Sequence, residues 1–279
     1  MTRTAPRAGR LLAMLMAIAA GAPLAQATEA TVFNEGLAAY QRGDWVAAAN
    51  AFRQAAPKDA EARYNLGVLH MRGLGVPHDI AEAHRLFRSA ADQGNPLAQT
   101  ALGYLYASGQ GVDVDYQEAF IWYRKAAEKG YSGAQAALGQ MYAESHGVAR
   151  DWAEAARWYR QAADQGYGLA QVKLAELYSR GDGVQADYAE AALLYRKAAE
   201  RGYTSGMAGL GYLYATGKGM PLDHVQAYRW LRTAARNGDS AAGRDLPVIA
   251  KRLTEEQIAE AERLSEAWHP SYPEGAPAL

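Results

Sequence analysis

The chain has 279 residues, 49% of them apolar, and a formal net charge of −1 at pH 7. This composition predicts a folded protein with a large buried core and excludes a chain that is disordered throughout. A nearly neutral chain is a poor partner for nucleic acid, because binding to a polyanion needs an excess of Lys and Arg. The chain contains no cysteine, which excludes disulfides, thiolate chemistry and metal sites with Cys ligands.

The first 27 residues have the pattern of a cleavable export signal. Arg3, Arg7 and Arg10 precede the apolar run LLAMLMAIAAGAPLA, and small residues stand at Ala25 and Ala27, where a signal peptidase needs them. The apolar run is shorter than the ~20 residues that span a bilayer, which weighs against the alternative of an uncleaved anchor helix. We expect cleavage after Ala27, which removes three positive charges, and a mature chain that is soluble in the periplasm or secreted.

Residues 28–59 predict one short helix pair. The stretch NEGLAAYQRGDWVAAANAFRQAA has Gly36, Tyr40 and Phe52 at spacings that resemble those of a tetratricopeptide repeat. A tight turn is expected at Gly43, before Asp44. We therefore interpret this segment as a tetratricopeptide-like N-terminal unit.

From residue 60 the sequence repeats with a period of 36 residues. The repeats follow one another without a gap as 60–95, 96–131, 132–167, 168–203 and 204–239. In the first half of each, as in ALGYLY, a Leu and an aromatic residue lie four apart on one face of a short helix, with Gly or Ala between them. This small residue lets a neighbouring helix approach closely, which explains why Gly is accepted at a cost of about 1 kcal/mol against Ala. The small residues are Gly67, Gly103, Gly139, Ala175 and Gly211.

A Gly-rich turn and a charged helix start follow in every repeat. The turns, such as GQGV and GDGV, follow a helix and lack the Lys-Ser/Thr of a phosphate-binding loop, so we interpret them as turns that need positive φ. An Asp followed three residues later by Glu or Gln stands at the start of the second helix in every repeat. A pair of carboxylates could act as a general acid and base, but an enzyme needs one such pair, so five copies indicate a capping box. The pairs are Asp79–Glu82, Asp115–Glu118, Asp151–Glu154, Asp187–Glu190 and Asp223–Gln226.

The second helix of each repeat has an apolar stripe and a glycine stop. Ala119, Trp122 and Tyr123 fall three and four residues apart, on a face that only stacking can bury. The tryptophans Trp122, Trp158 and Trp230 could form a cofactor-binding box, but their equal spacing favours core packing. The left-handed glycines expected to end these helices are Gly94, Gly130, Gly166, Gly202 and Gly238.

After Asp239 the period lapses. Residues 240–268 predict capping helices, the second of which starts at a capping box of Thr254 and Gln257 and is charged on its outer face. The tail 269–279 is rich in Pro and is expected to be disordered.

The repeated positions of residues 60–239 resemble the Sel1-like repeat of the tetratricopeptide-repeat superfamily. The resemblance lies in the stretch AQTALGYLYASGQGVDVDYQEAFIWYRKAAEKGY and its four companions. It implies an all-α fold in which antiparallel helix pairs stack into a right-handed superhelix, and an exported bacterial adaptor. Ser145 in place of a turn glycine and Ala175 in place of a helix glycine are expected to alter the spacing slightly. The β-lactam activity linked to disulfide-rich members does not carry over, because the chain lacks their cysteines and a Ser-x-x-Lys motif.

The expected function is that of a non-enzymatic scaffold of the periplasm, in envelope assembly or signalling. A solenoid places side chains of successive first helices on one concave strip, which can hold a protein or peptide partner of the cell envelope. By similarity to tetratricopeptide proteins, the lining residues flank the packed positions and vary between repeats, although plain solvent exposure would also let them vary. They are Tyr64, Val68, Arg72, Tyr104, Gln140, Glu144, Glu176, Arg180 and Tyr212. No cofactor or metal is expected.

Two other functions are compatible with the sequence. An envelope enzyme acting on peptidoglycan or a β-lactam-like substrate would need a cluster without counterpart in the other repeats. The six histidines are scattered, and the chain has neither an HExxH nor a Gly-x-Ser-x-Gly motif. His78 and His84 are close in sequence, but their spacing across a loop and a helix is a poor metal geometry. A secreted, host-directed ligand fits the leader as well as an adaptor does.

Overall fold

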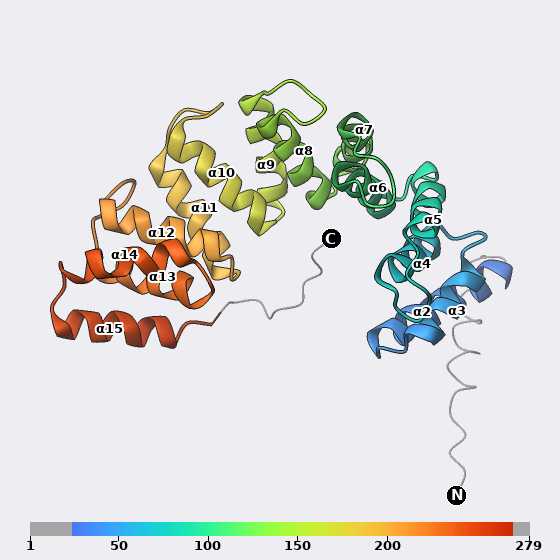
Figure 1. The fold of residues 1–279 in the computed structure, drawn as a ribbon, viewed down its shortest axis with the longest axis horizontal. Helices are drawn as coiled ribbons and strands as arrows, with labels where there is room; N and C mark the ends of the chain where they lie inside the picture. The colour runs from blue at the N-terminus through green and yellow to red at the C-terminus, as the bar shows by residue number, and fades with distance from the viewer. Residues whose placement is uncertain (1–23, 270–279) are drawn as a thin grey trace, which may run out of the picture. The chain divides into compact units, whose positions relative to one another are not determined.

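The computed structural model describes residues 24–269, and all regular secondary structure within that range is α-helical. The helices α2 to α15 follow one another as antiparallel pairs joined by short turns (Figure 1). This confirms the all-α repeat fold. Within the same range no helix is long and apolar enough to cross a membrane. Most of the predicted leader, at 1–23, and the tail after His269 lie outside the described residues.

The chain divides into two units, Met1–Lys125 and Ala126–Leu279. In the first unit each helix from α2 to α5 packs against the next one along the chain. The helices of this unit are α2 (Leu24–Gln41), α3 (Trp45–Ala55), α4 (Ala60–Arg72), α5 (Ile80–Asp92), α6 (Pro96–Ser108) and α7 (Tyr116–Glu128), whose last residues belong to the second unit.

In the second unit each helix from α8 to α13 packs against the next, and α13 packs against both α14 and α15. The first and second helices of the repeats therefore alternate along this unit. Its helices are α8 (Ser132–Glu144), α9 (Trp152–Asp164), α10 (Gly168–Arg180), α11 (Tyr188–Glu200), α12 (Thr204–Thr216), α13 (His224–Arg236), α14 (Ser240–Ala250) and α15 (Glu255–Glu266).

Four glycines of the first helices pack against an aromatic ring of the paired helix. A Cβ atom built on Gly139 would lie 2.8 Å from the ring of Tyr159, closer than side chains pack. The same relation joins Gly36 to Phe52 in the N-terminal pair. Further examples are Gly67 with Phe87 and Gly103 with Tyr123. The prediction that a small residue allows close helix approach is confirmed. The neighbour is an aromatic ring at these four glycines and Leu231 at Gly211, where a Cβ atom would lie 2.9 Å away.

The two departures from the repeat are accommodated locally. Ser145 takes the left-handed conformation of the glycine it replaces, with φ 63°, and its hydroxyl donates to the carbonyl oxygen of Val148 over 3.2 Å. No other non-glycine residue of the described chain has positive φ. In the repeat that carries Ala175, the ring of Tyr195 lies against Gly209 on the following first helix, where a Cβ atom would be 2.6 Å away.

The aspartate caps are present, but the reciprocal half of the predicted capping box is wrong. Oδ1 of Asp79 accepts the backbone N–H of Glu82 at 2.9 Å, as predicted. The N–H of Asp79 donates across the turn to the carbonyl oxygen of His70, 3.0 Å away, so it needs no bond from Glu82, whose carboxylate pairs with Arg85 instead. The same cross-turn bond joins Asp115 to Tyr106, Asp151 to Tyr142, Asp187 to Tyr178 and Asp223 to Tyr214.

The tryptophans lie in the core, as the equal spacing predicted. Trp122, Trp158 and Trp230 are 3%, 7% and 7% exposed. The glycine stops are also confirmed, with φ between the 84° of Gly166 and the 95° of Gly238.

Buried glutamines join three of the repeats to the repeat before each. Gln171 of α10 donates from Nε2 to the carbonyl oxygen of Ala163 at the end of α9, over 3.2 Å. That carbonyl also accepts the backbone N–H of Gly166 at 2.9 Å, so the group that would be buried without a partner in the absence of this bond is the side-chain amide of Gln171. Equivalent bonds run from Gln99 to Ala91 and from Gln135 to Ala127.

The second unit ends in two helices outside the repeat. Thr254 and Gln257 form both halves of the predicted capping box at the start of α15. Ser265 of α15 is fully buried and accepts a hydrogen bond from the hydroxyl of Thr233 at 3.0 Å, while Arg232 pairs with Glu262 at 2.9 Å. These bonds attach α15 to α13, the last helix of the repeats.

Candidate functional site

The nine residues predicted to line the binding strip occupy three positions of the first helix, four residues apart. Side chains spaced by four residues lie on one helical face. The middle position holds Val68, Tyr104, Gln140, Glu176 and Tyr212 in successive repeats, one turn after Tyr64 and one turn before the position of Arg72, Glu144 and Arg180.

Two of the nine side chains lie in the core of the first unit. Tyr64 is 6% and Val68 is 5% exposed. The ring of Tyr64 packs against that of Phe87, with centroids 5.7 Å apart. Three of its equivalents in later repeats, Ala136, Val172 and Ala208, are buried too, and the fourth, Thr100, is half-buried. Tyr64 and Val68 therefore offer little surface to a partner, and their position on the helix serves packing between repeats.

The other two predicted residues of the first unit are exposed. Arg72 ends α4 and is exposed to solvent. Tyr104 on α6 is 45% exposed, and its hydroxyl accepts a hydrogen bond from Nε2 of Gln110 at 2.7 Å. The ring of Tyr104 thus presents an apolar face and a polar edge outside the core.

Three first helices of the second unit carry the remaining residues, and their exposed charges differ. Gln140 donates from Nε2 to the Glu144 carboxylate on α8, over 3.0 Å. On α10, Glu176 is paired with Lys173 at 3.2 Å, whereas the exposed guanidinium of Arg180 makes no hydrogen bond or ion pair with the described residues. The face combines acidic, basic and amide groups, of which Arg180 is the cation available to a partner.

Tyr212 on α12 is tied to the C-terminal helices. Its hydroxyl donates to Oδ2 of Asp245 on α14, 2.7 Å away. Burial, the hydrogen bond to Asp245 and the charge of that carboxylate together raise the pKa of Tyr212 to about 12. The exposed ring edge of Tyr212 therefore belongs to a surface that α14 helps to form.

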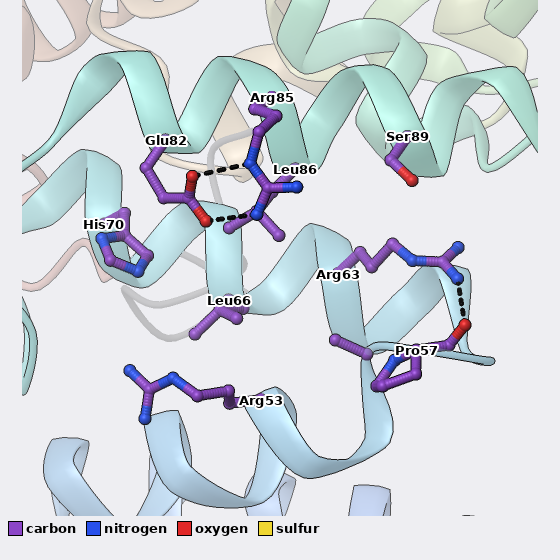
Figure 2. A pocket seen from close by; sticks show the side chains of 10 residues that line it. Arg53, Pro57, Arg63, Leu66, His70, Glu82, Arg85, Leu86 and Ser89 are labelled. Atoms are coloured by element: carbon purple, nitrogen blue, oxygen red, sulfur yellow. Dashed lines mark hydrogen bonds and ion pairs between the residues drawn. The ribbon is translucent and has the colours of Figure 1, made fainter.

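A pocket that the sequence analysis does not predict lies in the first unit, between α3, α4 and α5. Its volume is about 380 Å³, and Figure 2 shows Leu66 between Arg53 and the Glu82–Arg85 pair. The lining is rich in guanidinium groups, with apolar side chains between them. One signal for it was present in the sequence: Arg63 stands where the next three repeats have glutamine.

No group of three or more His, Asp or Glu side chains within residues 24–269 is arranged to hold a metal ion.

The family model described as Sel1 repeat matches the chain at residues 60–95, 96–131, 132–167, 168–203 and 204–239. The chain therefore belongs to the Sel1 repeat family, whose members generally mediate protein–protein interactions.

Two solved structures extend this comparison. A Sel1 repeat protein from Oxalobacter formigenes superposes with a TM-score of 0.74 at 29% identity, over 88% of this chain and 99% of its own. A protective antigen present in uropathogenic Escherichia coli strains, which displays an SLR fold, gives a TM-score of 0.58 at 29% identity, over 85% of this chain and 60% of its own. No curated protein matches the sequence.

Proposed function

We propose that the chain is a non-enzymatic adaptor that binds a protein or peptide segment on the exposed face of its first helices. The observation that carries this proposal is a contrast between positions of the same helix. The packed position is small in every repeat, Gly or Ala, whereas the position beside it changes from Tyr104 to Gln140 to Glu176. Repetition maintains the stack, and variation on the outer face supplies a surface with its own specificity.

The charges of the second unit support a partner with complementary groups. Arg180 is free to pair with a carboxylate, and Glu144 and Glu176 can pair with Lys or Arg once their internal bonds are exchanged. Such exposed pairs contribute to orientation and association rate more than to affinity. Apolar contact from Tyr212 of the same unit would supply the larger part of the binding energy.

The leader pattern supports a periplasmic location for this adaptor. Fractionation of cells that produce the tagged chain tests this directly: a mature form that begins at Thr28 in the periplasmic fraction is the expected result. Retention of the full-length chain in the cytoplasm or in the membrane would contradict it.

Site-specific crosslinking in intact cells tests the binding face. A photoreactive amino acid at Arg180 is expected to trap a protein partner. The same group at Leu193, which is 44% exposed on the second helix α11, provides the matched control and is expected to trap less. Equal crosslinking at both positions would show that the face of the first helices has no special role.

A host-directed ligand is the second candidate. The observation that favours it is the similarity to the protective antigen of uropathogenic Escherichia coli. Protease treatment of intact cells separates the two: a ligand on the cell surface is degraded, whereas a periplasmic adaptor is protected.

A further inference from the structure

The first repeat departs from the others at the position of the buried glutamine. Gln99, Gln135 and Gln171 each donate to a carbonyl of the preceding second helix. Arg63, one period before Gln99, donates from Nη2 to the carbonyl oxygen of Pro57 at 2.7 Å. Its other terminal nitrogen, Nη1, is buried and has no partner among the described residues. A buried donor without a partner in the chain is costly, and such a donor is satisfied by water or by a bound group.

A second departure from the later repeats lies on the same helix α4, seven residues after Arg63. His70 occupies the position that is Tyr106, Tyr142, Tyr178 and Tyr214 in the later repeats. There the tyrosine meets the arginine of the preceding second helix: the Arg196 guanidinium donates to the Tyr214 hydroxyl at 3.1 Å. His70 is smaller than tyrosine, and its buried Nδ1 has no partner among the described residues.

These two departures face the same pocket of about 380 Å³. Arg53, which follows Phe52 as Arg196 follows Tyr195, enters it from α3, with its Nη1 held by Asn50 at 3.0 Å. Figure 2 shows the Glu82–Arg85 pair on the opposite side, its atoms 2.6 Å apart.

The pocket carries an excess of positive charge. The hydrogen bond from Arg85 holds the pKa of Glu82 below its ordinary value, so that carboxylate stays ionised and the pair is neutral. The guanidinium groups of Arg53 and Arg63 have no carboxylate partner within the described residues. Leu66 and Leu86 also line the pocket, but each is only 4% exposed.

We propose that this pocket binds an acidic peptide segment, with a Glu or Asp carboxylate at Arg63 and Arg53. The planar fork of a guanidinium matches a carboxylate with two parallel hydrogen bonds. The volume falls in the range of ligand pockets and would hold roughly a dozen waters at about 30 Å³ each, which is more space than a bare inorganic anion fills. The proposal rests on the adaptor function and names one class of segment that the adaptor binds.

Titration calorimetry with two tetrapeptides tests the proposal on the mature chain. The probes are the acetylated and amidated peptide LEEL and its neutral counterpart LQQL, with inorganic phosphate as a third probe. LEEL is expected to bind at least about tenfold more tightly than LQQL. Absent binding of LEEL at millimolar concentration, or equal binding of the two peptides, would overturn the proposal. Binding of phosphate without LEEL would also overturn it, because it would show an inorganic anion site only.

The matched variant carries Arg63→Gln and His70→Tyr, which give the first repeat the residues of the repeats that follow it. It is expected to lose at least about tenfold in affinity for LEEL, while its melting temperature stays at or above that of the parent. Arg42→Gln removes the same charge from an exposed position outside the pocket and is expected to leave binding within about twofold. Full binding by the double variant would overturn the proposal.

A single substitution keeps the test decisive if the double variant does not fold. The Arg53 side chain is exposed, so Arg53→Gln is expected to fold and to weaken LEEL binding several-fold. Unchanged binding by Arg53→Gln would contradict the assignment. Crosslinking at Arg180 is independent of this pocket, so a failure here with a trapped partner there leaves the adaptor function standing.

Discussion

The Nε2 atom of Gln171 donates a hydrogen bond to the carbonyl oxygen of Ala163, 3.2 Å away, and so fastens α10 to the end of α9. Both groups are withdrawn from water by the stacking of one repeat on the next, and Gln171 is 2% exposed. Gln171→Ala removes the bond and leaves a small cavity. We expect a loss of about 1–3 kcal/mol in the free energy of unfolding, measured by urea denaturation.

Gln171→Met is the informative control for this bond. The last repeat carries Met207 at the same position, and its sulfur accepts a bond from Asn237 at 3.4 Å. Methionine fills the volume of glutamine without its amide, so a loss smaller than that of Gln171→Ala is expected. If alanine cost no stability, the glutamine bonds would not hold the repeats together.

Gly139→Ala tests the packing of an aromatic ring against a helix glycine. Helix propensity alone would make this substitution stabilising by about 1 kcal/mol. The new Cβ atom would lie 2.8 Å from the ring of Tyr159, and displacing a packed ring costs about 1–3 kcal/mol, so we expect net destabilisation in thermal unfolding.

Gly243→Ala is the matched control, at a helix glycine without a ring against it. Gly243 lies in α14, and a Cβ atom there would meet Ala235 at 3.6 Å, an ordinary contact. We expect this change to raise the melting temperature. A higher melting temperature in both variants would show that Gly139 is not required for packing against Tyr159.

Ser145→Gly tests the left-handed turn. A residue with a Cβ atom pays about 1 kcal/mol or more in the left-handed conformation that Ser145 adopts, and its bond to Val148 offsets part of that cost. Glycine at this position would avoid the strain but gain freedom in the unfolded chain. We expect a net gain of up to about 1 kcal/mol, and the reverse change, Gly181→Ser at the equivalent turn, should lose stability. Equal stability of Ser145→Gly and Gly181→Ser would contradict this account.

Tyr195 makes the stability of the second unit fall in alkali. Burial, with a contribution from Glu176, raises the pKa of Tyr195 to about 12, whereas an unfolded tyrosine titrates near pH 10. Below pH 10 both states keep the proton. Between pH 10 and 12 only the unfolded state releases it, so the free energy of unfolding decreases as pH rises. Tyr195→Phe should make this decrease shallower in urea denaturation between pH 9 and 12, and an unchanged slope would contradict the assignment.

The sequence predicts well what depends on local spacing. The Asp79 cap and the left-handed stop at Gly94 follow from neighbours within a few residues, and both are present. The partner of the Asp79 N–H could not be predicted in the same way. It is His70, nine residues earlier, which reaches it only because the turn folds back over the helix start.

The candidate surface was predicted less well, because exposure depends on the neighbouring helices. Val68 and Tyr104 occupy the same position of the repeat, yet Val68 is buried and Tyr104 is exposed. The pocket beside Arg63 arises where the N-terminal pair meets the first repeat, outside the 36-residue register. A repeat pattern carries no information about such a junction, although the substitution of Arg63 for glutamine marks it.

A charge reversal on α10 tests the proposed binding face most directly. Glu176→Lys with Arg180→Glu exchanges the charges of two side chains outside the core, so the melting temperature is expected to stay within about 2 °C of the parent. The partner is first identified by crosslinking at Arg180. The measurement is then how much of that partner the tagged, uncrosslinked variant recovers from cells. The adaptor account predicts that recovery is lost while the fold is kept. Full recovery of the partner by the folded variant would contradict it.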